Sequence, residues 1–171
     1  MSKIYDFKEQ LKLGQLGEKQ VSSYLNGLVS TVDVIDLSKV KRFQRYGIDG
    51  QLVYEGENGL LQSEYFDVKT EFNFHRTGKI FIEISADTNK EGGILSTKAS
   101  VFYYYNPYGG ELFKIYIQNI RNWYERAGIA VEQKTVKNNL GMEASGIIVS
   151  IDFLLNEGVI VEEYNIGNIK F

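Results

Sequence analysis

A long antiparallel pairing is encoded by the stretch Ile48-Asp-Gly-Gln-Leu-Val-Tyr54, Glu55-Gly-Glu-Asn-Gly59 and Leu60-Leu-Gln-Ser-Glu-Tyr-Phe-Asp-Val-Lys-Thr-Glu-Phe72. Two apolar runs flank a connection rich in glycine and asparagine, which is typical of a β-hairpin. If the chain turns near residues 57 and 58, Asp49 lies opposite the neighbourhood of Asp67. Strand alternation then places Asp67, Lys69 and Glu71 on one face, at steps of about 6.6 Å. The hairpin therefore predicts that acids and a lysine meet at one place.

A second turn near Phe74-His-Arg-Thr-Gly78 leads into an apolar strand over 79–85. We expect this strand to pair with the run 60–72, which places Glu83 beside Lys69. The two hairpins together form a three-stranded antiparallel meander.

The remaining chain is predicted to alternate between helices and strands. Before the meander, apolar spacing predicts a helix over Asp6–Leu28, loosened near Gly14 and Gly17, and a strand over Thr31–Leu37. After it, Ser96 is the expected cap of a helix over 97–103, and Asn106-Pro-Tyr-Gly-Gly110 is a turn. Further strands are expected at 103–105, 111–117, 130–136, 146–149 and 159–161, and helical segments at 118–127 and 151–155. We expect a single α/β domain over residues 1–171.

The amino-acid composition limits the kinds of metal and cofactor site that the chain can form. The chain has no cysteine and one histidine, His75, so thiolate sites and multi-histidine zinc sites are excluded. Carboxylates are the abundant ligands, and they favour a hard cation such as Mg²⁺, with Mn²⁺ as a substitute. No phosphate-binding loop pattern is present, so we expect no nucleotide cofactor. The opening residues lack a secretory signal and no long apolar run follows, which predicts a cytoplasmic protein without a membrane partner.

The residues that meet at the hairpin suit metal-assisted phosphodiester hydrolysis. Asp49 and Asp67, with the backbone carbonyl of Val68 between them, can hold one or two divalent cations in oxygen ligands. Lys69 can orient or activate water, or neutralise charge in a phosphorane-like transition state.

These residues also resemble a known family. Gly47-Ile48-Asp49-Gly50 followed by Asp67-Val68-Lys69 resembles the PD-(D/E)XK signature of the restriction-endonuclease-like nucleases, with Ile48 where the signature has proline. Glu18, after Gly17, looks like the helical glutamate of many of these nucleases, including archaeal-type Holliday-junction resolvases. The resemblance implies a restriction-endonuclease-like core, a mixed β-sheet with an antiparallel meander flanked by helices. It also implies that Asp49, Asp67 and Glu18 bind metal and that Lys69 is the catalytic lysine.

A second segment extends the resemblance to roughly residues 7–126. Lys79-Ile-Phe-Ile-Glu83 and Gly92-Gly-Ile-Leu-Ser-Thr-Lys-Ala99, with Phe102-Tyr-Tyr, are similar to a segment of phage- and prophage-associated nucleases. The expected activity is therefore Mg²⁺-dependent endonucleolytic cleavage of DNA, on branched or on phage or host DNA. A homodimer is the expected assembly, because it presents two sites to two strands.

Basic side chains that could contact DNA phosphates cluster before the first aspartate. The net charge of −3 gives no global sign of nucleic-acid binding, so local patches matter. The expected phosphate contacts are Lys39, Lys41, Arg42, Arg45, Arg76 and Lys98.

Several alternatives stay open at the level of sequence. Asp49 can be a turn residue beside Gly50, and Asp67 with Lys69 can be a surface ion pair. Glu71 and Glu83 can join the metal site or be ordinary strand residues, and His75 is expected to be an exposed turn residue. A non-catalytic nucleic-acid-binding or phage accessory protein that keeps the fold is the alternative function, and an exonuclease is the second enzyme candidate.

Overall fold

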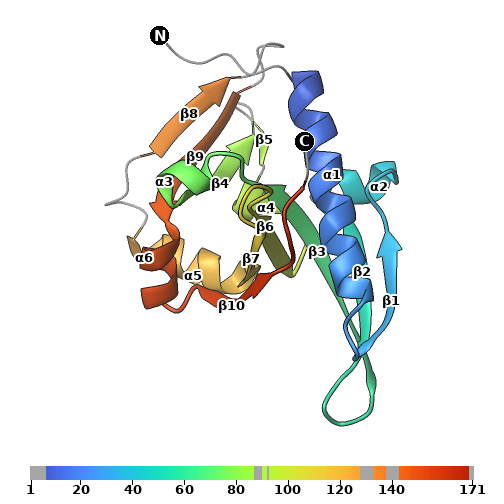
Figure 1. The fold of residues 1–171 in the computed structure, drawn as a ribbon. Helices are drawn as coiled ribbons and strands as arrows, with labels where there is room; N and C mark the ends of the chain where they lie inside the picture. Colours follow the sequence, from blue (N-terminus) through green and yellow to red (C-terminus); the bar gives the residue numbers. More distant parts are fainter. Residues whose placement is uncertain (1–6, 87–89, 92, 128–132, 138–142, 170–171) are drawn as a thin grey trace.

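The chain forms two β-sheets with helices packed around them (Figure 1). The computed structural model describes residues 7–86, 90–91, 93–127, 133–137 and 143–169. The larger sheet is mixed, because β3 and β6 are parallel while every other neighbouring pair in it is antiparallel. Its strands, in spatial order, are β1 (Thr31–Asp36), β2 (Gly50–Glu55), β3 (Leu61–Thr70), β6 (Val101–Tyr105), β7 (Glu111–Tyr116) and β10 (Ile160–Asn165).

The expected hairpin is confirmed. Strands β2 and β3 pair antiparallel from Gly50↔Phe66 to Glu55↔Leu61, the register that brings Asp49 next to Asp67. Gly59 lies in the connecting turn with a φ of 72°, a conformation that glycine adopts without strain. The antiparallel meander of this sheet is β1-β2-β3, and helices flank the sheet as expected.

The second expected hairpin is wrong. Strand β4 does not pair with β3 but lies in a separate antiparallel sheet and pairs with β9. The edge of β3 that it would occupy is taken by β6, a strand buried along its whole length. The strands of this smaller sheet, in order, are β5 (Lys90–Glu91), β4 (Lys79–Ala86), β9 (Glu143–Ser150) and β8 (Gln133–Lys137).

The first helix is continuous, so the expected interruption near Gly14 and Gly17 is wrong. Gly17 is buried where the helix approaches β3, and an added Cβ there would overlap Thr70. The helices are α1 (Phe7–Asn26), α2 (Lys41–Gln44), α3 (Phe74–Thr77), α4 (Gly93–Ser96), α5 (Ile117–Ala127) and α6 (Ile151–Asn156).

The helix expected to start at Ser96 is also wrong, because Ser96 ends α4 instead of capping a new helix. Residues 101–105 form β6, and all five are buried. A run of apolar residues buried on both faces is typical of a central strand, and here neighbouring strands cover both of its edges.

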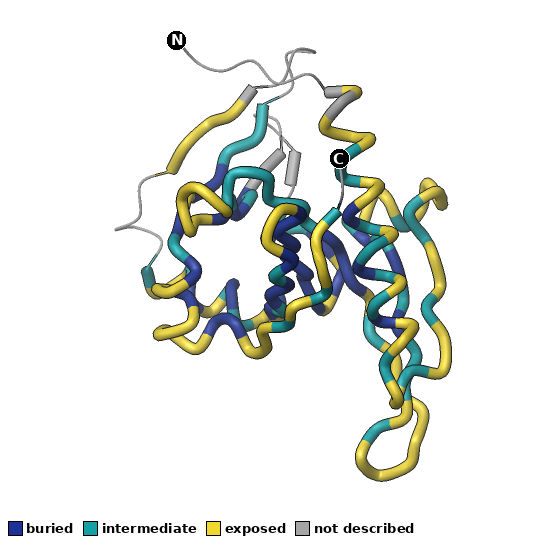
Figure 2. The backbone as a smooth tube through the Cα atoms, in the orientation of Figure 1, coloured by how far each residue is buried: buried dark blue, intermediate teal, exposed yellow. Residues whose placement is uncertain are grey.

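Two hydrophobic clusters pack on opposite faces of the large sheet, and β6, between them, is buried along its whole length (Figure 2). Val21 and Leu25 of α1 pack on one face with Phe66, Val68 and Tyr103. The other face packs against α5 and the smaller sheet, with Trp123, Phe102 and Tyr104 in its cluster. No described helix is long and apolar enough to cross a membrane.

Candidate functional site

The candidate site lies where β2 ends beside β3. The pairing stops at Gly50↔Phe66, so Asp67 to Thr70 have no strand neighbour on the β2 side among the residues that the structure describes. Asp49 lies just beyond the last pair, where its backbone N–H donates to Phe66 O at 2.9 Å. Its carboxylate Oδ2 accepts from the Val68 N–H at 2.8 Å, in the place of a strand neighbour. The end of the ladder therefore fixes Asp49 against β3.

The backbone carbonyl of Val68 points to the same gap. In an extended strand the N–H and C=O of one residue face the same edge. The Val68 N–H donates to Asp49, and strand geometry therefore directs its carbonyl to the same side. The carbonyl oxygen expected as a metal ligand is therefore aimed toward the Asp49 side.

Asp67 and Lys69 form a close ion pair. Their side chains lie on the face opposite Phe66 and Val68, as alternation requires. Lys69 Nζ lies 2.8 Å from Asp67 Oδ2, and the side chains are 35% and 6% exposed, respectively. Burial raises the pKa of Asp67 to about 7; Lys69 opposes this shift, and the nearby carboxylate of Asp49 adds to it.

Lys69 is surrounded by acids. Burial disfavours its charged form, but Asp67, Asp49 and Glu83 outweigh this cost and raise its pKa above the ordinary value. Glu83 thus influences Lys69 from β4, although the expected strand pairing is absent. Glu71 is held at the smaller sheet instead, where its Oε1 accepts from the Phe81 N–H at 3.1 Å.

A cavity of about 630 Å³ opens beside these residues. Glu18 lines it from α1, and its pKa is raised to about 7 by burial, then by the charges of Asp49 and Asp36, while Lys69 lowers it. The cavity brings together Glu18, Asp49, Asp67 and Lys69, the four residues expected to be catalytic. The full lining is Leu11, Gln15, Glu18, Lys19, Ser22, Asp36, Ser38, Lys39, Gln44, Gly47, Ile48, Asp49, Asp67 and Lys69.

Of the expected phosphate-binding residues, all but Arg76 lie at the cavity or on and around α2. Lys39 lines the cavity, and the exposed side chains of Lys41, Arg42 and Arg45 lie on or next to α2. Lys98 is exposed, and its backbone N–H donates to Tyr46 O just after α2. Arg76 does not line the cavity; it lies on α3 and donates to Asn73 Oδ1 at 2.6 Å.

Sequence reasoning missed several residues of the cavity. Asp36 ends β1, where it pairs with Gly50, and its Oδ1 accepts from the Ser38 N–H and hydroxyl. Pairing the expected strand over 31–37 with 48–54 would have found it. Gln15, Lys19 and Ser22 lie three or four positions from Glu18 or from one another, the spacing of one helix face.

The oxygen atoms at the site are of the ligand types that bind a hard divalent cation. Asp49, Asp67 and Glu18 supply carboxylate oxygens, and Val68 supplies a carbonyl oxygen, the ligand types that Mg²⁺ prefers. Within the described ranges, no three acidic or histidine side chains form a complete metal-binding group. Burial and neighbouring carboxylates raise the pKa values of Glu18 and Asp67 to about 7. A cation that binds here would therefore displace the protons that these carboxyl groups hold.

Comparison with protein-family models, curated proteins and solved structures gave no match.

Proposed function

We propose that this chain is a Mg²⁺-dependent endonuclease that hydrolyses DNA phosphodiester bonds on a restriction-endonuclease-like core. The observation that carries the proposal is the convergence of Asp49, Asp67 and Lys69 at the end of the β2–β3 ladder. Glu18 faces the same cavity from α1. Strand and helix thus supply the residues that the PD-(D/E)XK resemblance implies, in one place.

The order of the elements supports the same proposal. Helix α1 precedes the antiparallel meander β1-β2-β3, and the paired acids lie at its last two strands. Lysine follows the second acid by two residues, so both side chains share a face. The resemblance implies a mixed sheet with an antiparallel meander flanked by helices, although the expected meander continued into the strand over 79–85, which lies in the smaller sheet.

Asp49, Asp67, Glu18 and the Val68 carbonyl would hold the cation. Bound there, Mg²⁺ would supply Lewis acidity toward a phosphate oxygen and toward water. Asp67 is fixed by Lys69 and Asp49 by the Val68 N–H, so both carboxylates are positioned before substrate arrives.

Lys69 has two roles open to it, and its charge favours one. Its raised pKa keeps it protonated at neutral pH, so it is a poor proton acceptor. It therefore orients the attacking water by donating a hydrogen bond and neutralises negative charge that develops on the phosphate.

DNA is the proposed substrate, and cations near the cavity suit its backbone. Lys39 lines the cavity and Lys41, Arg42 and Arg45 follow it along the chain. These charges offset the repulsion between phosphates and the acids. Two copies of the chain would present two such sites to the two strands.

Cleavage tests the proposal. Supercoiled, linear, single-stranded and four-way-junction DNA are incubated with Mg²⁺, Mn²⁺ or EDTA. We expect metal-dependent cutting, including cutting of covalently closed circles, that Asp67→Asn and Lys69→Met reduce by about a hundredfold or more. Asp33→Asn and Lys134→Met change exposed residues outside the cavity and serve as matched controls. Cutting of linear DNA alone contradicts an endonuclease, and equal rates in all variants contradict the site.

One observation favours a non-catalytic nucleic-acid-binding or accessory role. Lys69 and Asp67 already form a close pair, and no complete metal-binding group exists among the residues described. Such a protein would bind DNA equally well with Mg²⁺ or EDTA, and Lys69→Ala would leave binding unchanged.

A further inference from the structure

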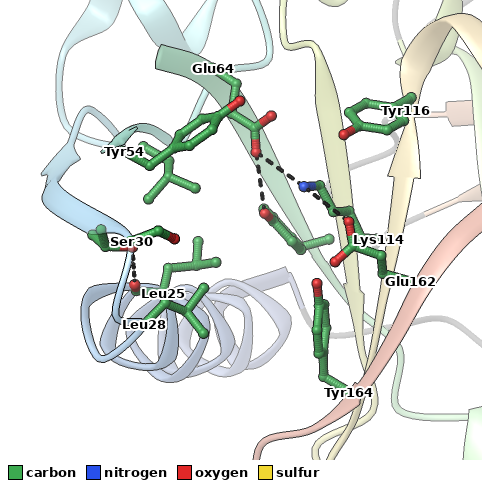
Figure 3. A pocket seen from close by; sticks show the side chains of 12 residues that line it. Leu25, Leu28, Ser30, Tyr54, Glu64, Lys114, Tyr116, Glu162 and Tyr164 are labelled. Carbon is green, nitrogen blue, oxygen red and sulfur yellow. Dashed lines mark hydrogen bonds and ion pairs between the residues drawn. The ribbon is translucent and has the colours of Figure 1, made fainter. Parts of the chain in front are cut away.

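A second pocket, of about 240 Å³, lies on the α1 face of the large sheet. Leu25 and Leu28, at and just beyond the end of α1, form one wall, and side chains from the strands of the sheet form most of the rest (Figure 3). The catalytic proposal uses none of these residues. The volume is below the range of about 300–1,000 Å³ that is usual for whole ligands, so the pocket suits one planar group of simple or fused rings.

The polar centre of the pocket is a lysine between two glutamates. Lys114 Nζ lies 3.6 Å from Glu64 Oε1 and 3.5 Å from Glu162 Oε1 (Figure 3). Charge-assisted hydrogen bonds are about 2.7–2.9 Å long, so these pairs are loose. Lys114 and Glu64 are nevertheless mostly buried, with side chains 14% and 10% exposed. Both groups therefore keep hydrogen-bonding capacity for a ligand.

The charges argue against an ionic ligand. An anion would meet the carboxylates of Glu64 and Glu162. An organic cation would meet the ammonium of Lys114, which already lies 5.2 Å from the centre of the Tyr116 ring. A neutral ligand with adjacent donors and an acceptor can instead bond to both members of the loose Glu64–Lys114 pair.

The walls of the pocket are aromatic. The rings of Tyr54, Tyr116 and Tyr164 surround the ion pairs (Figure 3). The Tyr103 hydroxyl donates to Glu64 Oε1 at 3.4 Å. Aromatic side chains stack on planar bases, and carboxylates and ammonium groups read base edges. The lining therefore matches a planar heterocycle.

We propose that this pocket binds a nucleobase, with guanine preferred, and this inference rests on the proposed action on DNA. Guanine carries two adjacent N–H donors beside a carbonyl oxygen, so Glu64 accepts from the donors and Lys114 donates to the oxygen. The other bases lack that pair of donors. An unpaired or extruded base of a bound strand is the occupant, because the base edge must be free.

The pocket is within reach of a strand bound at the candidate active site. Glu64 and Asp67 are three residues apart on β3, so their side chains lie on opposite faces of the sheet. Helix α1 lines both the pocket and the cavity: Glu18 and Leu25 are seven residues apart on it, about 10 Å along the helix. A strand positioned at the cavity can thus place a neighbouring base in the pocket.

Amide NMR of the full chain without divalent metal tests this directly. Guanosine, inosine, adenosine and cytidine are titrated separately, since nucleosides carry the base without phosphate. We expect guanosine to shift the amide signals of Glu64, Tyr103 and Lys114, with weaker binding of inosine, which lacks the exocyclic amine. Glu64→Gln and Tyr116→Leu should each weaken guanosine binding by about tenfold or more. Glu163→Gln, on an exposed neighbour outside the pocket, should not change it.

Different results would overturn the nucleobase proposal and the nuclease proposal. No shift with any nucleoside, or equal binding by all variants, overturns the proposal. Binding of agmatine in place of guanosine makes this a pocket for an organic cation and also overturns it. The substitution Tyr116→Leu changes a residue that is 38% exposed, so it remains informative if Glu64→Gln does not fold. DNA cleavage without nucleoside binding refutes the pocket alone, and nucleoside binding without cleavage refutes the nuclease alone.

Discussion

Glu71 makes hydrogen bonds to both β-sheets, one through its backbone and one through its side chain. Its backbone N–H donates to Tyr105 O in the large sheet, and its Oε1 accepts from the Phe81 N–H in the smaller one. Burial raises the pKa of Glu71 to about 7, although the Phe81 hydrogen bond and Lys69 both oppose the shift. The folded protein therefore retains a proton at pH values where the unfolded chain has already released it.

This proton makes stability depend on pH. Because the folded pKa of about 7 exceeds the ordinary 4.5, the stabilising contribution is complete below pH 4.5 and is lost as pH rises through 7. Glutamine keeps the acceptor for Phe81 N–H without the charge. We expect Glu71→Gln to raise the free energy of unfolding by roughly 1–3 kcal/mol at about pH 8 and to have little effect at about pH 4.5.

Urea unfolding of wild type and Glu71→Gln at both pH values measures this difference. Glu125→Gln, on an exposed position of α5, is the control. A Glu71→Gln effect that is the same at both pH values would show that the glutamate does not titrate in this range.

At the level of single residues, the sequence predicted those site residues whose positions depend only on the register of one hairpin. Asp49, Asp67 and Lys69 follow from the hairpin turn and from alternation along β3. Asp36 was not predicted as a site residue, because the strand over 31–37 was recognised but not paired with the strand over 48–54. The influence of Glu83 on Lys69 depends on packing between two sheets, which no local pattern contains.

Among the elements, α1 depends on a close approach at Gly17. An added Cβ there would overlap Thr70 Oγ1 and lie 3.1 Å from Thr70 Cβ, whereas at Gly14 nothing lies within 4 Å. We expect Gly17→Ala to destabilise the fold by roughly 1–3 kcal/mol through overpacking. Gly14→Ala should stabilise it by up to about 1 kcal/mol, since alanine favours helix.

Thermal and urea unfolding of the two variants measure this contrast, and Gly17→Ala/Thr70→Ala should recover part of the stability. Equal effects of the two single substitutions would mean that α1 does not approach β3 so closely. The same close approach explains why a glycine expected to loosen the helix does not: it permits packing that more than offsets its low helix propensity.

Helix α2 carries the charge that the proposed DNA binding needs. Lys41 and Arg42 lie on the helix and Arg45 at its end, all exposed. We expect their joint replacement by alanine to weaken DNA binding. The slope of log K against log salt should become shallower by about 0.9 for each phosphate that these side chains no longer neutralise. Arg76→Ala, on α3 and outside the cavity, is the comparison.

Binding of a short duplex at several salt concentrations, with Ca²⁺ or EDTA, measures both quantities. If Arg76→Ala alters the salt slope and the α2 variant does not, the DNA path lies over α3 instead. The expected location of the phosphate-binding residues would then be wrong.

For the whole molecule, local patterns were enough for most elements but not for their assembly. The mixed α/β class, the β2–β3 hairpin and the strand near 111–117 follow from periodicity and turns. The separate sheet does not, because β4 pairs with β9, a strand far along the chain. The parallel pairing of β6 with β3 is also non-local, and β6 occupies the edge that the expected second hairpin needed.

The central claim, that Asp49, Asp67 and Lys69 form one metal-dependent hydrolytic centre, is tested most directly by measuring Mn²⁺ binding and DNA cleavage on the same protein samples. We expect Asp49→Asn and Asp67→Asn to abolish both metal binding and cleavage. Lys69→Met should retain metal binding within about tenfold and abolish cleavage, because the lysine acts on water and phosphate. Cleavage that persists in both aspartate variants, or Mn²⁺ binding that is unaffected by either, would contradict the claim.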